Sequence, residues 1–272
     1  MGTLIDSNPQ QLVWLITGTS SGIGRHLALE VLKRGDRVIA TARARSMPQL
    51  QSLAVLGADV LELDVTDSPE HLKEIAKKAV ALHGHVDVVV NNAGISVMGS
   101  IEEHTLEESY QQFNTNFFGG VSIARAFLPY MRERRSGTIL WIGSLAGWTP
   151  SISFGMYSAA KHAVRGISET LNAEISHLGL RSHVVELGYF STNIIPNRIP
   201  YVPRISDYSE IIGRADGYFD SIYGHEPGDP AKAATIIVDL VRGRVLRRAR
   251  RFRLFWGWVR ITIKRPSCIA RT

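Results

Sequence analysis

The sequence predicts a single α/β domain with a doubly wound, mostly parallel sheet of six or seven strands and helices on both faces. Up to about residue 190, short β-rich apolar runs alternate with longer stretches of helical spacing, which is typical of βαβ units. Most of the short runs are continuously apolar, as expected for parallel strands covered on both faces. The chain has 272 residues, 44% of them apolar and 21% charged, which is enough for one large globular domain.

Six strands are expected in the body of the chain, at 12–17, 37–41, 59–63, 86–90, 138–142 and 182–187. The first helix is expected over 23–34 and should end at Gly35, because glycine readily adopts the left-handed conformation found after helix C-termini. The helix after the third strand should begin at Ser68 and Pro69, since serine is a good cap and proline is tolerated in the first turn. Helical spacing returns over 231–241.

Between residues 188 and 230 the regular alternation breaks down, and five prolines interrupt a stretch rich in Ile and Tyr. Irregular segments of this length inside a compact domain are usually lids or binding segments, so we call residues 188–230 the lid segment. A seventh strand at the sheet edge is expected over 251–257. Residues 1–257 would then form the domain, and 258–272 a basic tail.

The basic residues are unevenly distributed. Residues 241–272 carry eleven Arg and Lys and no acidic residue, whereas the rest of the chain has a net charge of −5. A nucleic-acid partner is therefore not expected for the body. A solvated basic end is the simplest interpretation of the tail, with contact to an anionic membrane surface or to nucleic acid, or an error in the gene model, as alternatives.

The remaining features indicate compartment and metal content. Cys268 is the only cysteine, so no intrachain disulfide can form and a reducing compartment is favoured. The chain shows neither a secretion signal nor an apolar run long enough to span a membrane, and we expect a cytoplasmic protein. His83 and His85 lack a third ligand in the sequence pattern, and no metal is expected.

A glycine-rich turn follows the first expected strand. Gly18, Gly22 and Gly24 are spaced Gly-x-x-x-Gly-x-Gly and lead directly into a helix. Small residues let the backbone approach a pyrophosphate, and a helix N-terminus presents free N–H groups to it. The turn therefore favours a dinucleotide site, with a tight strand-to-helix connection as the alternative. The other residues assigned to this site are Ser20, Ser21 and Ile23.

The segment TGTSSGIG at 17–24 resembles the cofactor motif of the short-chain dehydrogenase/reductase family, and four further motifs follow in that family's order. They are NNAG at 91–94, Asn116 in NTNFFG, Ser144 after the fifth strand, and Tyr157 with Lys161 in YSAAK. The resemblance covers roughly residues 12 to 192. It implies a Rossmann fold, a nicotinamide dinucleotide cofactor, hydride transfer to or from a carbonyl carbon, and a homo-oligomer, either a dimer or a tetramer, formed through the helices of Asn116 and Tyr157.

The residue chemistry supports this implication. Tyr157 and Lys161 are four apart, so on a helix they share one face. A neighbouring ammonium favours the phenolate and is expected to lower the pKa of Tyr157 towards neutrality, where it can give or take a proton. By resemblance, Ser144 would hold the substrate oxygen, Lys161 would also bind the nicotinamide ribose, and Asn116 would position a water in the proton relay.

The choice between NAD and NADP depends on the end of the second strand. It reads VIATAR, with no acidic residue to select NAD. Arg43 is expected to pair with the 2′-phosphate of NADP, although it could instead be a solvent-facing arginine. By resemblance, Asp64 lies at the adenine, or else caps the next turn, and Thr192 contacts the nicotinamide carboxamide. Further cofactor contacts are expected from Val65, Asn92, Ala93 and Gly94.

We therefore expect an NADP-dependent alcohol dehydrogenase or ketone reductase acting on a small molecule. Similar sequences include hydroxysteroid and retinol dehydrogenases, which favours a lipophilic substrate. Apolar side chains near the expected site either line it or only pack the lid segment: Trp148, Phe154, Ile194, Ile195, Tyr201 and Tyr208. The alternative function is a catalytically silent NADP-binding sensor or scaffold that uses the basic tail for interaction.

Overall fold

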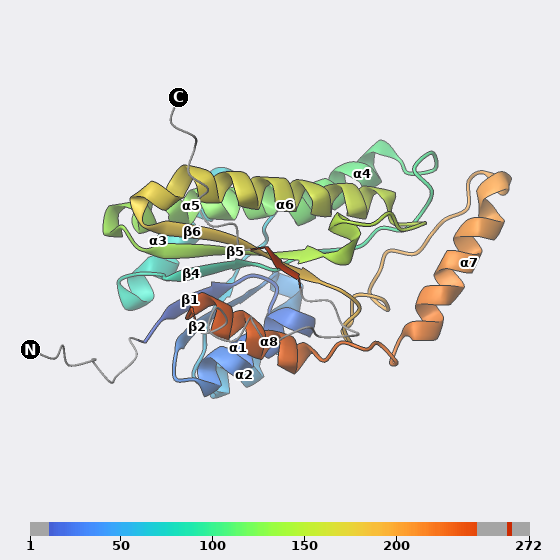
Figure 1. Ribbon diagram of the computed structural model, residues 1–272. Coiled ribbons are helices and arrows are strands. Elements are labelled where there is room, and N and C mark those ends of the chain that lie inside the picture. The colour runs from blue at the N-terminus through green and yellow to red at the C-terminus, as the bar shows by residue number, and fades with distance from the viewer. Residues whose placement is uncertain (1–10, 244–259, 263–272) are drawn as a thin grey trace, which may run out of the picture.

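The computed structural model describes residues 11–243 and 260–262, and these ranges contain one seven-stranded sheet (Figure 1). The strand order is β3-β2-β1-β4-β5-β6-β7. The first six strands are parallel, and β7 pairs antiparallel with β6. Their bounds are β1 Val13–Ile16, β2 Arg37–Ala42, β3 Asp59–Glu62, β4 Val88–Asn91, β5 Gly137–Ser144, β6 Leu180–Leu187 and β7 Arg260–Thr262.

Helices cover both faces of the sheet, as Figure 1 shows. The helices α1, α2 and α8 lie on one side, and α3, α5 and α6 on the other. The bounds of the α-helices are α1 Gly22–Lys33, α2 Gln51–Val55, α3 Pro69–His83, α4 Leu106–Phe113, α5 Gly119–Arg134, α6 Gly155–Ile175, α7 Ser206–Ile222 and α8 Pro230–Val241. Among the described residues, no helix combines the length and the apolar character needed to cross a membrane.

The central strands are apolar on both faces because each face meets a different layer of helices. Trp14 and Ile16 of β1 pack in the cluster that contains α1 and α8, whereas Leu15 packs in the cluster that contains α3 and α5. Side chains alternate across a strand, so a continuously apolar run serves both clusters at once. This confirms the doubly wound fold expected from the sequence.

The helix ends follow the expected local chemistry. Gly35, after α1, has a φ of 82°, a left-handed conformation that glycine adopts without steric cost. Ser68 caps α3 by accepting a hydrogen bond from the backbone N–H of His71 at 3.2 Å, and Pro69 is the first residue of that helix. Both expectations are confirmed.

Two parts of the chain differ from expectation. The lid segment contains α7, a helix of 17 residues, where only an irregular excursion was expected. All five prolines of the segment lie outside α7, so they delimit the helix and do not interrupt it. The seventh strand is Arg260–Thr262, further along the chain than expected and within the stretch assigned to the tail. The stretch 251–257 lies outside the described residues.

Candidate active site

The predicted motifs meet at one edge of the sheet. The strands β1, β4 and β5 are parallel neighbours, so their carboxyl ends lie together. The glycine-rich turn follows β1, the NNAG motif begins at the last residue of β4, and Ser144 ends β5. The connections from β1 and β4 leave in opposite directions, and ligands of such sheets bind at this switch point.

The glycine-rich turn is packed too closely for side chains. A Cβ atom on Gly18, whose φ is 70°, would lie 3.0 Å from the Cα of Ala93. A Cβ on Gly24 would lie 2.4 Å from Nδ2 of Asn92 and 2.5 Å from the carbonyl oxygen of Gly18. Only glycine therefore fits at these positions without rearrangement.

The turn and the NNAG motif form one hydrogen-bonded unit. Nδ2 of Asn92 donates to the carbonyl oxygens of Thr17 at 2.8 Å and Gly18 at 3.1 Å. In return, Oγ1 of Thr17 accepts from the backbone N–H groups of Asn92 at 2.9 Å and Ala93 at 3.0 Å. The motifs are far apart in sequence, yet each determines the backbone conformation of the other.

The first turn of α1 suits a phosphate group. Ser21 at its N-cap makes no side-chain cap hydrogen bond, and no acidic residue lies in the first turn. The backbone N–H groups of this turn that lack a helical partner, and the positive end of the helix dipole, are therefore available to an anion. Thr192 faces this turn, because a Cβ on Gly22 would lie 3.5 Å from the Cβ of Thr192. The residues present thus fit a dinucleotide.

Ser144, Tyr157 and Lys161 come together where β5 meets α6. The hydroxyl of Ser144 is hydrogen-bonded to that of Tyr157, and Oγ of Ser144 also accepts from the N–H of Ala146 at 3.2 Å. Nζ of Lys161 lies over the Tyr157 ring, 5.6 Å from its centroid, and donates to the carbonyl oxygen of Ile142 at 2.8 Å. The helical spacing therefore places both side chains on one face, as expected.

The electrostatics of the pair differ from expectation. Burial raises the pKa of the Tyr157 phenol, and the hydrogen bond from Ser144 offsets this only in part. Burial also lowers the pKa of Lys161 to about 8. The expected lowering of the Tyr157 pKa by Lys161 is thus wrong for this structure, because desolvation disfavours the phenolate more than its neighbours favour it.

Asn116 stabilises the segment after NNAG. It lies in a π-helical turn, Asn114–Phe118, between α4 and α5, and such turns are frequent at functional sites. Its carboxamide accepts from the N–H of Ile95 and donates to the carbonyl oxygen of the same residue, both at 2.8 Å. Both polar groups of the side chain are thus already engaged with the backbone.

Asn91 was missing from the predicted site residues. Its carboxamide is buried, and neither polar atom has a hydrogen-bond partner among the described residues. With Asn116 and Lys161 it lines a small internal cavity. Unpaired buried polar groups are rare in folded proteins and often mark functional positions. The sequence signal that could have identified Asn91 was its place as the first residue of the NNAG motif.

The residues expected at the adenosine end are distributed as follows. Arg43 directly follows β2 and is exposed, and it forms no ion pair with any described residue. Oδ1 of Asp64 accepts from the backbone N–H and the hydroxyl of Thr66, at 2.9 and 2.7 Å. This oxygen therefore caps the following turn, which was the alternative role expected for Asp64. Val65 is buried against Gly119.

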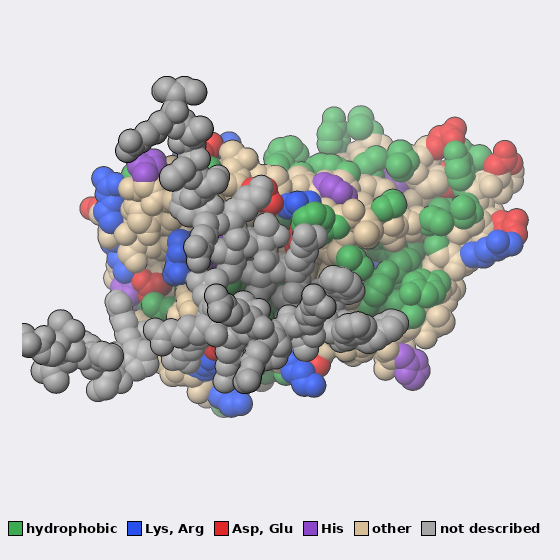
Figure 2. Space-filling model, viewed as in Figure 1, with side chains coloured by type: hydrophobic (Ala, Val, Ile, Leu, Met, Phe, Trp, Pro, Cys, Tyr) green, Lys and Arg blue, Asp and Glu red, His purple; other side chains and the backbone are tan. Residues whose placement is uncertain are grey.

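A cluster of aromatic side chains extends from Tyr157 to α7 in the lid segment. Phe154 packs edge-on against Tyr157, with ring centroids 5.9 Å apart, and against Phe219 of α7 at 4.6 Å. Phe219 also packs with Met98 and Ile195. Figure 2 shows hydrophobic side chains gathered between the sheet and α7. Of the other expected apolar residues, Ile194 is exposed, Tyr201 and Tyr208 donate to glutamates, and Trp148 stacks with Arg165.

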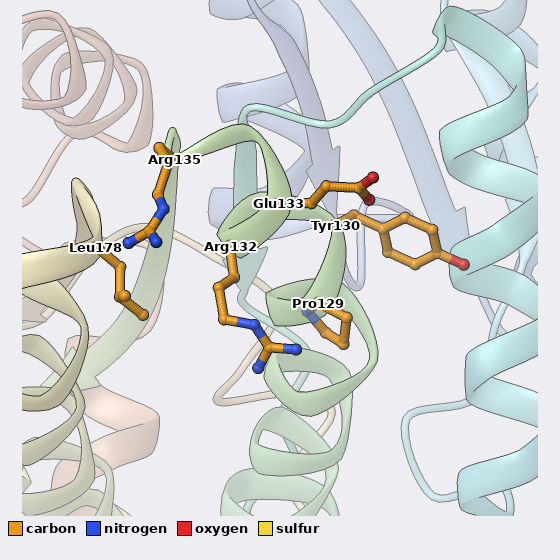
Figure 3. Close-up of a pocket in the computed structure, with 6 residues that line it drawn as sticks. All are labelled: Pro129, Tyr130, Arg132, Glu133, Arg135 and Leu178. Carbon is orange, nitrogen blue, oxygen red and sulfur yellow. The ribbon is translucent and has the colours of Figure 1, made fainter.

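A second pocket lies away from these motifs (Figure 3). It is at the C-terminal end of α5, just before β5 begins, and therefore at the amino-terminal edge of the sheet. Its lining residues are Pro129, Tyr130, Arg132, Glu133, Arg135 and Leu178.

No group of three or more metal-ligating side chains occurs within the described part of the chain. His83 contacts Asp59, and His85 contacts Asp87.

Comparison with known proteins decides the family. The family model described as short chain dehydrogenase matches residues 12–200. The chain belongs to the short-chain dehydrogenase family. A 3-ketodihydrosphingosine reductase of Bacteroides thetaiotaomicron is 36% identical over 214 residues, which are 78% of this chain and 73% of that protein. The protein is therefore an oxidoreductase that uses a nicotinamide cofactor and acts on CH–OH or ketone groups.

Solved structures of the family share the fold. A short-chain dehydrogenase from Streptomyces avermitilis is 36% identical, with a TM-score of 0.75 over 91% of this chain and 86% of that one. A variant of actinorhodin polyketide ketoreductase, solved with NADPH, is 29% identical, with a TM-score of 0.74 over 87% of this chain and 92% of that one. The two structures confirm the Rossmann-type domain.

Proposed function

We propose that the protein is an NADP-dependent oxidoreductase of lipophilic ketones and alcohols, with Ser144, Tyr157 and Lys161 as its catalytic residues. The observation that carries the proposal is the hydrogen bond between Ser144 and Tyr157, with the buried ammonium of Lys161 over the Tyr157 ring. This group lies at the same sheet edge as the glycine-rich turn. A carbonyl oxygen placed against both hydroxyls would be held beside a proton donor.

Bound nicotinamide supplies a hydride to the carbonyl carbon in reduction and accepts one from the alcohol carbon in oxidation. In reduction, Ser144 donates a hydrogen bond to the substrate oxygen, and Tyr157 transfers its phenolic proton to that oxygen. Burial raises the pKa of Tyr157, so the phenol is protonated at neutral pH and ready to act as the acid. Lys161, which is charged below its pKa of about 8, stabilises the phenolate left behind.

The NADP preference rests on Arg43. It is exposed immediately after β2, where an acidic residue would repel a 2′-phosphate. Its guanidinium has no ion-pair partner among the described residues and can form charge-assisted hydrogen bonds with a phosphate. A structural relative was solved with NADPH, and another with NADP.

The preference for a lipophilic substrate rests on the surroundings of Tyr157. Phe154 and Phe219 form an aromatic wall beside its ring, and Met98 and Ile195 extend the apolar surface. Apolar walls with few convergent polar groups are typical of sites for lipophilic ligands. The Bacteroides relative is named for a keto substrate, 3-ketodihydrosphingosine.

Two further expectations belong to this proposal. We propose a homo-oligomer formed through the helices that carry Asn116 and Tyr157, where Phe118 is 53% exposed on the same π-helical turn as Asn116. Light scattering of the purified protein tests the oligomer.

We also propose a cytoplasmic location, which the single cysteine favours, and fractionation of cells tests it.

A spectrophotometric screen tests the proposed function. Purified protein is given NADPH or NADH with a panel of ketones, and absorbance of the reduced cofactor is followed. We expect turnover with NADPH and apolar ketones, and a loss of about 100-fold or more in kcat for Tyr157→Phe. Binding of NADPH without turnover across a broad panel would instead indicate a silent sensor or scaffold.

A further inference from the structure

Glu103, in the loop between β4 and α4, is a buried carboxylate that the catalytic site does not use. It is 3% exposed. Its Oε1 accepts three hydrogen bonds from the lid segment, from the hydroxyl of Tyr201 at 2.8 Å and from the backbone N–H groups of Arg204 and Ile205, both at 2.9 Å. Its Oε2 accepts from Ser100 at 2.7 Å. One side chain thus binds three residues of a segment that is distant in sequence.

The loop that carries Glu103 is itself well ordered by local contacts. Thr105 and Glu108 form a reciprocal capping box at the start of α4. Arg204 pairs with Glu108 at 2.8 Å and donates to the backbone carbonyl of Glu103 at 2.6 Å. A buried carboxylate surrounded by donors is therefore attached to a capped helix, which provides a firm base for the lid segment.

The three points held by Glu103 lead directly into α7. Ile205 is the N-cap of this helix, and it lacks a capping side chain of its own. Figure 1 shows α7 standing apart from the sheet, joined to it by extended segments. A second tie holds the body of the helix, where Arg198 pairs with Asp216 at 2.6 Å and Asp220 at 2.7 Å.

The position of α7 determines one wall of the substrate site. Phe219 of α7 packs on Phe154, and Phe154 packs on the ring of Tyr157. The backbone N–H groups at the start of α7 have no helical partner of their own. Without the carboxylate, the N–H groups of Arg204 and Ile205 would each lose a partly buried hydrogen bond to the loop before α4.

We propose that Glu103 is a positioning residue that seats α7 and, through Phe219, sets the preference of the site for apolar substrates. The part of the inference that concerns substrate preference rests on the proposed function, whereas the seating of α7 does not. The carboxylate suits this task because it stays ionised. Burial opposes its ionisation, but hydrogen bonds from Arg204, Ser100, Ile205 and Tyr201 lower the pKa of Glu103 to about 2.

The test compares Glu103→Ala with Glu103→Gln, which keeps an acceptor oxygen, and with Glu107→Ala, which removes an exposed glutamate in the first turn of α4. Hydrogen exchange of the full chain, followed by mass spectrometry, measures the amides of 199–223. We expect about tenfold faster exchange there in Glu103→Ala, near wild-type exchange in Glu103→Gln, and no change in Glu107→Ala. Tyr201→Phe removes one donor and should give a smaller change in the same peptides.

The kinetic arm uses methyl nonyl ketone and acetone as probes. In Glu103→Ala, the KM for the long ketone should rise about tenfold, while the KM for NADPH and kcat/KM for acetone stay within about twofold of wild type. Unchanged exchange at 199–223, or an equal loss for both ketones, would overturn the inference. If wild-type protein reduces neither ketone, the proposed function fails, and the exchange experiment still decides whether Glu103 seats α7.

Discussion

Nζ of Lys161 donates a hydrogen bond to the carbonyl oxygen of Ile142, 2.8 Å away and two residues before Ser144 on β5. The lysine thus ties α6 to β5 and helps to align Tyr157 with Ser144. The ammonium is almost fully buried, 6% exposed, and burial lowers its pKa to about 8. The buried charge of Lys161 therefore disfavours folding, and residues with such a cost are often found at functional positions.

Replacing this lysine should stabilise the protein and inactivate it. For Lys161→Met we expect a gain of about 1–3 kcal/mol in the free energy of unfolding near neutral pH, because a pKa lowered in the folded state means that the charge is costly there. Denaturant titration measures the gain, and NADPH oxidation should be lost. A variant less stable than wild type near neutral pH would contradict the prediction.

The gain should depend on pH in a defined direction. The cost of burying Lys161 is absent above about 10.5, its unperturbed pKa, and complete below its folded pKa of about 8. The advantage of Lys161→Met over wild type should therefore shrink as pH rises through this window. Denaturant titrations at several pH values measure the trend, and an advantage that grows with pH would show that another group is responsible.

Ketone reduction should fall as the medium becomes alkaline. The proposed mechanism needs a protonated Tyr157, whose pKa is raised, and a charged Lys161, whose pKa is about 8. The lysine is thus the first of the two to lose its proton, and kcat/KM for reduction should decline above about pH 8. A stopped assay over a range of buffers measures the profile. A rate that still rises well above this pH would count against a charged lysine.

Cofactor preference should change on removal of a single guanidinium. For Arg43→Ala we expect kcat/KM with NADPH to fall by about 10- to 100-fold and that with NADH to stay within about twofold, since only a 2′-phosphate would bind this charge. Arg45→Ala, also exposed but two residues further on, is the matched control. An equal loss with both cofactors would place Arg43 outside the 2′-phosphate site.

Two glycines allow a matched steric test. Gly24→Ala would place a Cβ against Asn92 and the carbonyl of Gly18, and we expect a loss of about 2 kcal/mol or more in stability together with weaker NADPH binding. Gly166→Ala in α6 meets no atom within 4 Å and should gain about 0.5–1 kcal/mol from helix propensity. Thermal melts and NADPH titration measure both. Similar behaviour of the two variants would refute the close packing at Gly24.

The strands and the motif positions were predictable because their signals are local. The run Val13–Ile16 needs only its own apolar side chains to be identified as a strand covered on both faces. Residues Ser206–Ile222 gave no comparable signal. Only two residues of that helix, Ile212 and Phe219, are buried, so its apolar pattern is weak, and the flanking prolines suggested an irregular loop.

The short seventh strand was misplaced for a related reason. Arg260–Thr262 is an edge strand of three residues, and its position depends on pairing with β6 as well as on its own sequence. Asn91 shows the same limit at the level of one side chain. Its place in NNAG was visible, but that its carboxamide would be buried without a partner beside Lys161 followed only from the packing of β4.

The succession of strands and helices up to about residue 190, and the residue types at the site, were determined by the sequence alone, because apolar periodicity and glycine spacing act over a few neighbouring residues. Tertiary structure decided the protonation behaviour of Tyr157 and Lys161 and the role of Glu103. Those properties depend on how much protein surrounds a charge and which donors reach it. For Glu103, the donors Tyr201, Arg204 and Ile205 lie about a hundred residues along the chain, and only the folded chain brings them to its carboxylate.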